Sequence, residues 1–171
     1  LLVIANQSYA NNIIVGNLGS KIQGEVISTF SNPWSFSFLN NDHILVSTKP
    51  GKIWLLDSEG SKKEVKNIVS VEYAGQGGMG DIVPHPDFEK NYYIYFSYIT
   101  SDDEGKTRYA VVDRAELRDF SSPKFENIER LWEQHPAVKS KGHFSHRIAF
   151  GPKGSEQENK IFITSGDRQM Q

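Results

Sequence analysis

The strongest constraint on the fold of this chain is a two-strand pattern that occurs three times. In each copy, a short strand of alternating apolar and polar residues leads into a turn of polar, Gly or Pro residues. A second strand then follows, rich in β-branched or aromatic residues and ending in Ser or Thr. The copies cover residues 34–47, 81–97 and 147–164. Because the copies share one form, the pattern predicts a scaffold of similar antiparallel units.

Further strand signals lie between the copies, at residues 52–57, 108–117 and 126–132. They bring each repeat to about four strands. Helical periodicity is not sustained in any segment, because Gly and Pro interrupt the chain too often. Four-stranded antiparallel units at a period of roughly 40 to 50 residues are typical of β-propellers, whose blades bury their faces against one another. We therefore predict an all-β propeller fold.

The repeats also predict how the chain is organised. A closed propeller needs about four to eight blades, and two full repeats and the start of a third are found here. We therefore expect residues 11–171 to be the N-terminal part of one propeller domain, roughly its first two to three blades, truncated at the C-terminus. Residues 1–10 are interpreted as the remnant of a signal peptide, with Ser8 and Ala10 at the small positions of a cleavage site. This predicts a periplasmic or secreted protein; the alternative is an edge strand.

Composition excludes several functional classes. The formal net charge is −2 and the Lys and Arg residues are scattered, so a nucleic-acid partner is not expected. The chain has no Cys, which excludes disulfides, thiolate metal sites and a cysteine nucleophile. After the N-terminal apolar run, no stretch of about 18 apolar residues follows, so no membrane span is predicted.

Two segments are candidates for a ligand site. In propellers, the connections at one end of the inner strands converge on a central channel. His143 directly precedes an inner-strand signal, and Gln76, within the glycine-rich segment 75–80, occupies the equivalent place one repeat earlier. We expect both to face the same cavity. An imidazole can accept a proton near neutral pH, and the glycines allow close backbone approach to a flat ligand. The alternatives are a loop histidine that caps a strand and a turn between blades.

Other residues are weaker candidates. Asp167, at a strand end, could bind a cation or orient a polar ligand, although Gly-Asp is also a common turn. The spacing of His143 and His146 directs the two rings apart on a strand, so no metal site is assigned in this chain. Three residues are interpreted as aromatic packing between blades: Trp34, Trp54 and Trp132.

Five segments carry a family resemblance. They are Asn-Pro-Trp at 32–34, Thr-Lys-Pro-Gly-Lys-Ile-Trp at 48–54, Gly-Gln-Gly-Gly-Met-Gly-Asp-Ile-Val-Pro-His-Pro-Asp-Phe at 75–88, His-Phe-Ser-His-Arg-Ile-Ala-Phe-Gly-Pro at 143–152 and Ser-Gly-Asp at 165–167. In this order and combination, from about Pro33 to the end, the chain resembles the soluble glucose/sorbosone dehydrogenase family. These proteins are the aldose sugar dehydrogenases that depend on pyrroloquinoline quinone (PQQ).

The resemblance implies a six-bladed propeller exported to the periplasm. PQQ would lie flat in the central cavity, assisted by bound calcium, and electrons would pass on to an external acceptor. His143, which opens the family's His-Phe-x-x-Arg motif, would be the catalytic base. It would take the proton of the anomeric hydroxyl of an aldose while hydride passes from C1 to the quinone, leaving a lactone. Gln76 and Asp167 match family positions that bind cofactor or substrate.

The sequence departs from the family at one position and leaves alternatives open. The family usually has small residues between Phe144 and Arg147, so His146 is expected to add bulk or a titrating group. The remaining quinone contacts and the calcium ligands are expected beyond Gln171, so the chain alone is expected to be inactive. One alternative is a non-enzymatic propeller that binds carbohydrate or protein. Another is a calcium-dependent lactonase on a similar scaffold.

Overall fold

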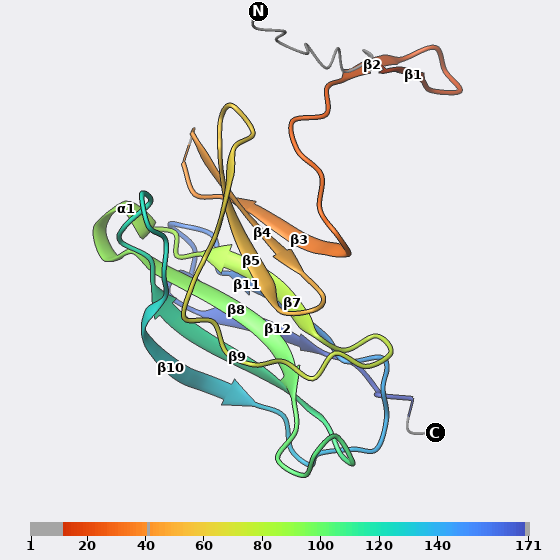
Figure 1. Cartoon of the computed structure of the whole chain (residues 1–171), viewed down its shortest axis with the longest axis vertical. Helices are drawn as coiled ribbons and strands as arrows, with labels where there is room; N and C mark the ends of the chain where they lie inside the picture. The colour runs from red at the N-terminus through yellow and green to blue at the C-terminus, as the bar shows by residue number, and fades with distance from the viewer. Residues whose placement is uncertain (1–11, 41, 170–171) are drawn as a thin grey trace, which may run out of the picture.

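After an N-terminal hairpin, three antiparallel sheets follow one another along the chain in the computed structural model, which describes residues 12–40 and 42–169 (Figure 1). The first sheet contains β3 (Pro33–Phe38), β4 (His43–Thr48), β5 (Lys52–Asp57) and β6 (Lys62–Glu64). The second contains β7 (Met79–Pro84), β8 (Tyr93–Thr100), β9 (Tyr109–Glu116) and β10 (Glu126–Glu133). The third contains β11 (Ser145–Phe150) and β12 (Ile161–Ser165). Each strand pairs with the next in sequence, so the sheets are simple meanders.

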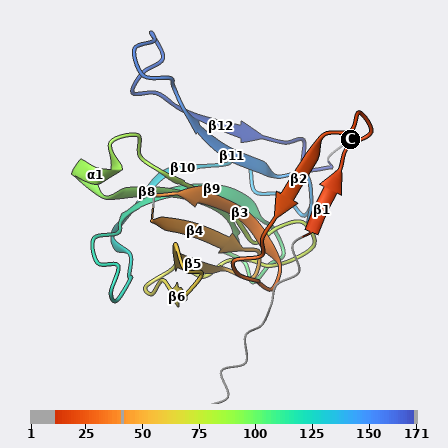
Figure 2. The same cartoon turned by 90° about the horizontal axis from the view of Figure 1, so that it is seen from above.

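This arrangement confirms the predicted all-β propeller fold. Two four-stranded blades and the first two strands of a third lie side by side, as Figure 2 shows from above. Three further features were not predicted: the hairpin of β1 (Asn12–Val15) and β2 (Lys21–Gly24), which stands away from the other sheets, the edge strand β6, and the short helix α1 (Phe88–Asn91). The interpretation of residues 1–10 as a signal-peptide remnant falls outside the described residues.

Strand β8 shows why the blades must stack. Its residues are mostly β-branched or aromatic, and six consecutive side chains are buried. Ile94, Phe96 and Tyr98 share one apolar cluster with Leu45 and Ile53 of the first blade. Burying a side chain of this size stabilises the fold by about 1.5–3 kcal/mol. The contact between the first and second blades is therefore a continuous apolar core.

The opposite face of β8 packs on the third sheet. Side chains alternate between the two faces of a strand, so Tyr95 and Ile99 point away from the first blade. Tyr95 packs with Ile148 of β11, and Ile99 packs with Phe144, which is only 2% exposed. Phe144 thereby anchors the segment that leads into β11.

Within the part of the chain that the structure describes, no helix is long and apolar enough to cross a membrane.

Strand β3 turns its serines inward and its aromatic residues outward. The Ser35 side chain faces β7, whereas Phe36 and Phe38 are 63% and 64% exposed. Trp34 is 48% exposed, which differs from its predicted role in packing between blades. The exposed aromatic residues line an apolar groove of about 460 Å³ on the face of the first blade that points away from the second blade.

A buried carboxylate joins the inner strands of all three sheets. Asp81 of β7 is 2% exposed. Its Oδ1 accepts a hydrogen bond from the Ser35 hydroxyl at 2.6 Å, and its Oδ2 accepts one from the Ile148 N–H at 2.9 Å. The Arg147 guanidinium lies 3.4 Å from Oδ2. Buried carboxylates are costly unless they are paired and hydrogen-bonded, and Asp81 meets both conditions.

We expect Asp81→Asn to destabilise the fold. The amide would present N–H groups to donors that now point at a carboxylate, which should lower the free energy of unfolding by about 2–4 kcal/mol. Urea denaturation measures this change. Asp42→Asn, at an exposed position, is the matched control and should change the same quantity by less than about 0.5 kcal/mol. An equal effect of both substitutions would show that Asp81 does not join the blades.

Candidate functional site

A pocket of about 650 Å³ lies where the three sheets meet at one end. Its walls are Trp34, Lys49, Gln76, His143, Phe144, Ser145, His146, Gly166 and Asp167. The three site residues predicted from the sequence, His143, Gln76 and Asp167, are all in this set. They come from different segments, the connection that leads into β7 and the two ends of the β11–β12 pair. The structure therefore brings His143 and Gln76 to one cavity.

Gln76 holds the backbone of the loop that carries His143. Its side-chain Oε1 accepts a hydrogen bond from the His143 N–H at 2.8 Å. The Gln76 N–H in turn donates to the carbonyl oxygen of Lys141 at 2.7 Å. Because Oε1 is engaged with the loop, the Gln76 side chain offers mainly its Nε2 donor to a ligand in the pocket.

His143 and Asp167 form a hydrogen-bonded pair. The His143 Nδ1 lies 2.8 Å from the Asp167 Oδ1, and the two side chains are 49% and 54% exposed. An ionised carboxylate can only accept a hydrogen bond, so Nδ1 carries the proton and Nε2 is the proton acceptor. The N–H of Gln169, together with His143, holds the pKa of Asp167 below its ordinary value. The pair thus fixes the tautomer that a general base requires.

The backbone around His143 is strained. His143, Ser145 and His146 have φ values of 51°, 64° and 50°, in the left-handed region. Each such residue costs roughly 1–2 kcal/mol without glycine. The strain coincides with a register shift between Ser145 and Ile148 in the pairing of β11 with β12. Strain and bulges of this kind cluster at functional sites.

Close backbone contact holds this strained segment in place. Burial alternates residue by residue along it, with Phe144 and His146 inside and His143 exposed to the pocket. The Gly166 N–H donates to the Phe144 carbonyl oxygen at 3.1 Å. A Cβ at Gly166 would lie 2.0 Å from the carbonyl oxygen of His143, so only glycine fits there. The two ends of the β11–β12 pair are therefore locked together beside His143.

His146 is a buried structural residue, which corrects the expectation that it adds a titrating group near the substrate. It is 3% exposed, and burial lowers its pKa to about 4, against the opposing charge of Asp81. The Ser97 hydroxyl donates to the His146 carbonyl oxygen at 2.7 Å, so it accepts from the His146 Nδ1 at 2.8 Å. A Cβ at Gly80 would lie 2.0 Å from the ring. His146 is therefore a neutral part of the pocket wall.

Lys49 and Trp34 were not predicted as site residues. Lys49 lies in the β4–β5 turn, and its Nζ is 5.1 Å from the centroid of the Trp34 ring. One sequence signal could have found Lys49. In an antiparallel meander, the β4–β5 turn lies at the same end of the blades as the start of β7, where Gln76 was expected.

Metal ligation has no support in the described ranges. Residues 12–40 and 42–169 contain no group of three His, Asp or Glu side chains placed to hold a metal ion. His143 and His146 bond to different partners, Asp167 and Ser97.

We expect the stability of the fold to depend on pH through His146. Its folded pKa of about 4 lies below the ordinary value of 6.5, so only the unfolded chain binds this proton between those values. Stability should therefore fall by up to about 3 kcal/mol as the pH drops from 6.5 to 4. Urea denaturation across this range measures the loss. His146→Gln should flatten that part of the profile, whereas His135→Gln, at an exposed histidine, should retain it. An unchanged profile in His146→Gln would contradict the assignment.

Comparisons with known proteins identify the family to which this chain belongs. A family model described as Glucose / Sorbosone dehydrogenase matches residues 30–171. The chain is 30% identical over 139 residues to the aldose sugar dehydrogenase YliI of Escherichia coli (strain K12), which covers 80% of this chain and 35% of that protein. It is 24% identical over 151 residues to the uncharacterized protein slr1608 of Synechocystis sp. (strain ATCC 27184 / PCC 6803 / Kazusa). That match covers 83% of this chain and 34% of the relative. The chain thus spans about a third of the length of these relatives.

Solved structures show the same fold. The soluble aldose sugar dehydrogenase of E. coli in the apo-form matches with a TM-score of 0.71 and 27% identity, over 81% of this chain and 39% of that one. The PQQ-bound aldose sugar dehydrogenase of Streptomyces coelicolor matches with a TM-score of 0.62 and 22% identity, over 82% and 47%. Because the family model covers most of the sequence and these structures share its fold, the chain belongs to the glucose/sorbosone dehydrogenase family.

Proposed function

We propose that this chain carries the base-bearing part of the active site of a PQQ-dependent aldose sugar dehydrogenase that acts at C1. The observation that carries the proposal is the His143–Asp167 hydrogen bond of 2.8 Å in the wall of a pocket of about 650 Å³. The aldose sugar dehydrogenase of E. coli supports the choice of substrate class. The proposal concerns the full-length protein, to which this chain contributes the base but not every cofactor contact.

His143 acts as the general base in this proposal. Its Nε2 takes the proton of the anomeric hydroxyl while the hydrogen on C1 leaves as hydride, and the C1–O bond becomes the carbonyl of a lactone. Asp167 holds the ring in the productive tautomer and stabilises the imidazolium that forms. General-base catalysis of this kind contributes about 10²- to 10⁴-fold to the rate. A histidine suits this role because its charge changes near neutral pH.

The pocket fits an organic cofactor. Its volume lies within the range of about 300–1,000 Å³ that is usual for ligand sites, and its wall combines the Trp34 ring with the Lys49 ammonium. When bound, PQQ supplies the hydride acceptor. The Streptomyces relative was solved in its PQQ-bound form, which supports this choice. Calcium belongs to the proposal with ligands from other parts of the protein, since the described residues present no suitable side-chain cluster.

The remaining pocket residues have supporting roles. Gln76 fixes the position of the base through the His143 N–H and can donate from Nε2 to a sugar hydroxyl. His146 stays neutral above pH 4, so it does not compete with His143 for the substrate proton. An external electron acceptor and a periplasmic or secreted location complete the proposal.

We expect His143→Ala in the full-length protein to lower kcat by about 10²- to 10⁴-fold, because the base is lost. PQQ- and sugar-dependent dye reduction measures this change. Sugar affinity should change little. His135→Ala, at an exposed histidine in the preceding loop, is the matched control and should retain activity. If His143→Ala kept full turnover, or if the protein bound sugar without oxidising it, the proposal would give way to a binding propeller.

We expect Asp167→Asn to lower kcat by about 10- to 100-fold with little change in KM. The amide no longer fixes the proton on Nδ1, but the pair is half exposed, so the loss is smaller than the roughly 10⁴-fold measured for the buried aspartate of serine proteases. Asp87→Asn, at the opposite end of β7, is the control. If the substitution lowered the amount of folded protein and left the kcat of the folded fraction unchanged, Asp167 would have a structural role only.

A further inference from the structure

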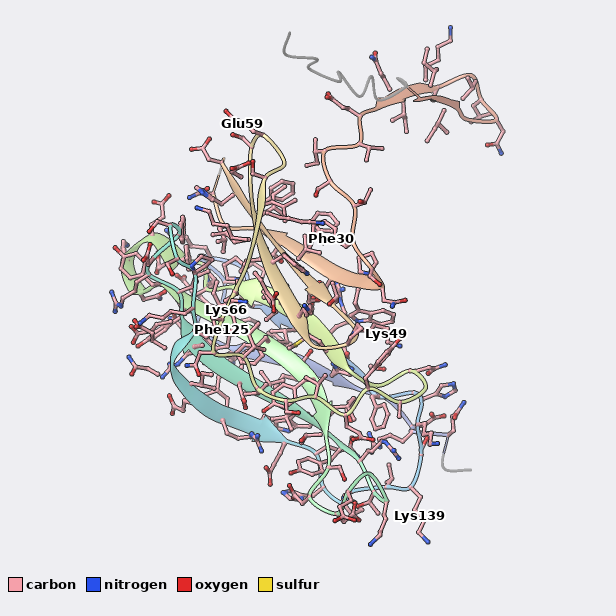
Figure 3. All side chains as sticks on the ribbon, in the orientation of Figure 1. Phe30, Lys49, Glu59, Lys66, Phe125 and Lys139 are labelled. Atoms are coloured by element: carbon pink, nitrogen blue, oxygen red, sulfur yellow. The ribbon has the colours of Figure 1, made fainter. Side chains whose placement is uncertain are left out.

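Lys49 brings a positive charge to the wall of the His143 pocket. Its backbone is fixed at both ends, since its N–H donates to the Asn32 carbonyl oxygen at 3.0 Å and its carbonyl oxygen accepts from the Met79 N–H at 2.9 Å. Figure 3 labels Lys49 in the β4–β5 turn, at the edge of the first blade. The position of the charge is therefore set by the fold of the blade rather than by a free loop.

The ammonium is held in place but not neutralised. It lies 5.1 Å from the centroid of the Trp34 ring and 5.9 Å from that of Tyr73. One N–H donates to the Gly75 carbonyl oxygen at 3.2 Å. Across the described ranges, no carboxylate lies within 4.0 Å of Lys49, and Asp167, the acidic residue in the pocket wall, bonds to His143. The ammonium has three donors, so donors remain for a ligand.

We propose that Lys49 and Trp34 form a carboxylate-binding subsite in the wall of the His143 pocket. The ammonium would bind the carboxylate of a ligand, and the half-exposed Trp34 ring would contact its apolar part. The subsite lies on the first blade, whereas His143 lies beside the third sheet. A ligand that reaches both is thereby oriented across the pocket.

Two sources could supply this carboxylate. One is the quinone cofactor, which carries carboxylates, and the other is an acidic sugar such as a uronic acid. The inference depends on the proposed function only for the choice of these probes. A purely structural role must also be distinguished, because Lys49 bonds to Gly75 next to Gln76.

The chain contains a matched control. Lys62 lies 4.8 Å from the centroid of Phe30 and 5.4 Å from that of Trp54, and it donates to the Thr29 carbonyl oxygen at 2.8 Å. It thus has two aromatic neighbours and one backbone acceptor, as Lys49 does, but it lies outside the His143 pocket. Replacing Lys62 removes an equivalent set of contacts without touching the subsite.

The test is a calorimetric binding measurement on the full-length protein with PQQ, methyl-esterified PQQ, glucuronate and glucose as separate probes. Lys49→Met should bind PQQ, glucuronate or both about 10- to 100-fold more weakly than the parent protein, because a charge-assisted contact is lost. It should bind the uncharged probe of the same pair, the ester or glucose, as the parent does. Lys49→Arg should restore most of the affinity, and Lys62→Met should leave every probe unchanged.

The pattern across probes decides between the outcomes. A selective loss for PQQ assigns the subsite to the cofactor, and a selective loss for glucuronate assigns it to an acidic sugar. Raising the salt concentration should weaken the binding of the charged probe to the parent protein and have less effect on its binding to Lys49→Met. Equal losses for charged and uncharged probes would overturn the inference and leave Lys49 as a support for the Gln76 loop. If Lys49→Met bound all four probes as the parent protein does and oxidised sugar at an unchanged rate, the inference would be overturned and the proposed function would stand.

Discussion

A single buried carboxylate sets the relative position of the three sheets. Asp81 accepts hydrogen bonds from Ser35 of the first blade and from Ile148 of the third sheet, and it lies on the inner strand of the second. Because it is 2% exposed, water cannot replace either partner. Polar networks of this kind are stable only when every member is satisfied. The inner strands of the three sheets are therefore held together at Asp81, and the pocket lies directly beyond them.

The site uses this rigidity to keep an unfavourable backbone. His143, Ser145 and His146 all adopt the left-handed conformation, which persists only where the surroundings determine it. Phe144 is fixed by the core beside β8, and the His146 ring fits against Gly80. The result is an imidazole whose backbone is held by Gln76 and whose ring is held by Asp167. Little reorganisation remains to be made when a substrate binds.

Alternation and turn chemistry predicted most strands of the blades, and β5 begins and ends at the predicted residues, but β1, β2 and β6 were not predicted. The repeat placed His143 and Gln76 at one end because equivalent connections of a meander lie together. The same argument places the turn that carries Lys49 at this end, although Lys49 was not predicted as a site residue, whereas the burial of His146 could not be predicted in this way. The burial of His146 depends on the missing Cβ of Gly80, in another blade. The contact of the Lys49 ammonium with the Trp34 ring lies within the first blade, whereas its hydrogen bond to the Gly75 carbonyl oxygen joins it to the segment that leads into the second. Such contacts between blades leave no local pattern.

The walls of the pocket have a consequence for how such a protein can change. His143 and Asp167 lie at the ends of the third sheet, Gln76 lies at the entrance to the second, and Lys49 and Trp34 lie on the first. No blade holds a working set by itself. If recombination exchanged one blade between relatives, the architecture would be preserved, but the residues of that blade would be separated from their partners in the other blades. The pocket therefore depends on the contacts between blades and not on any single blade.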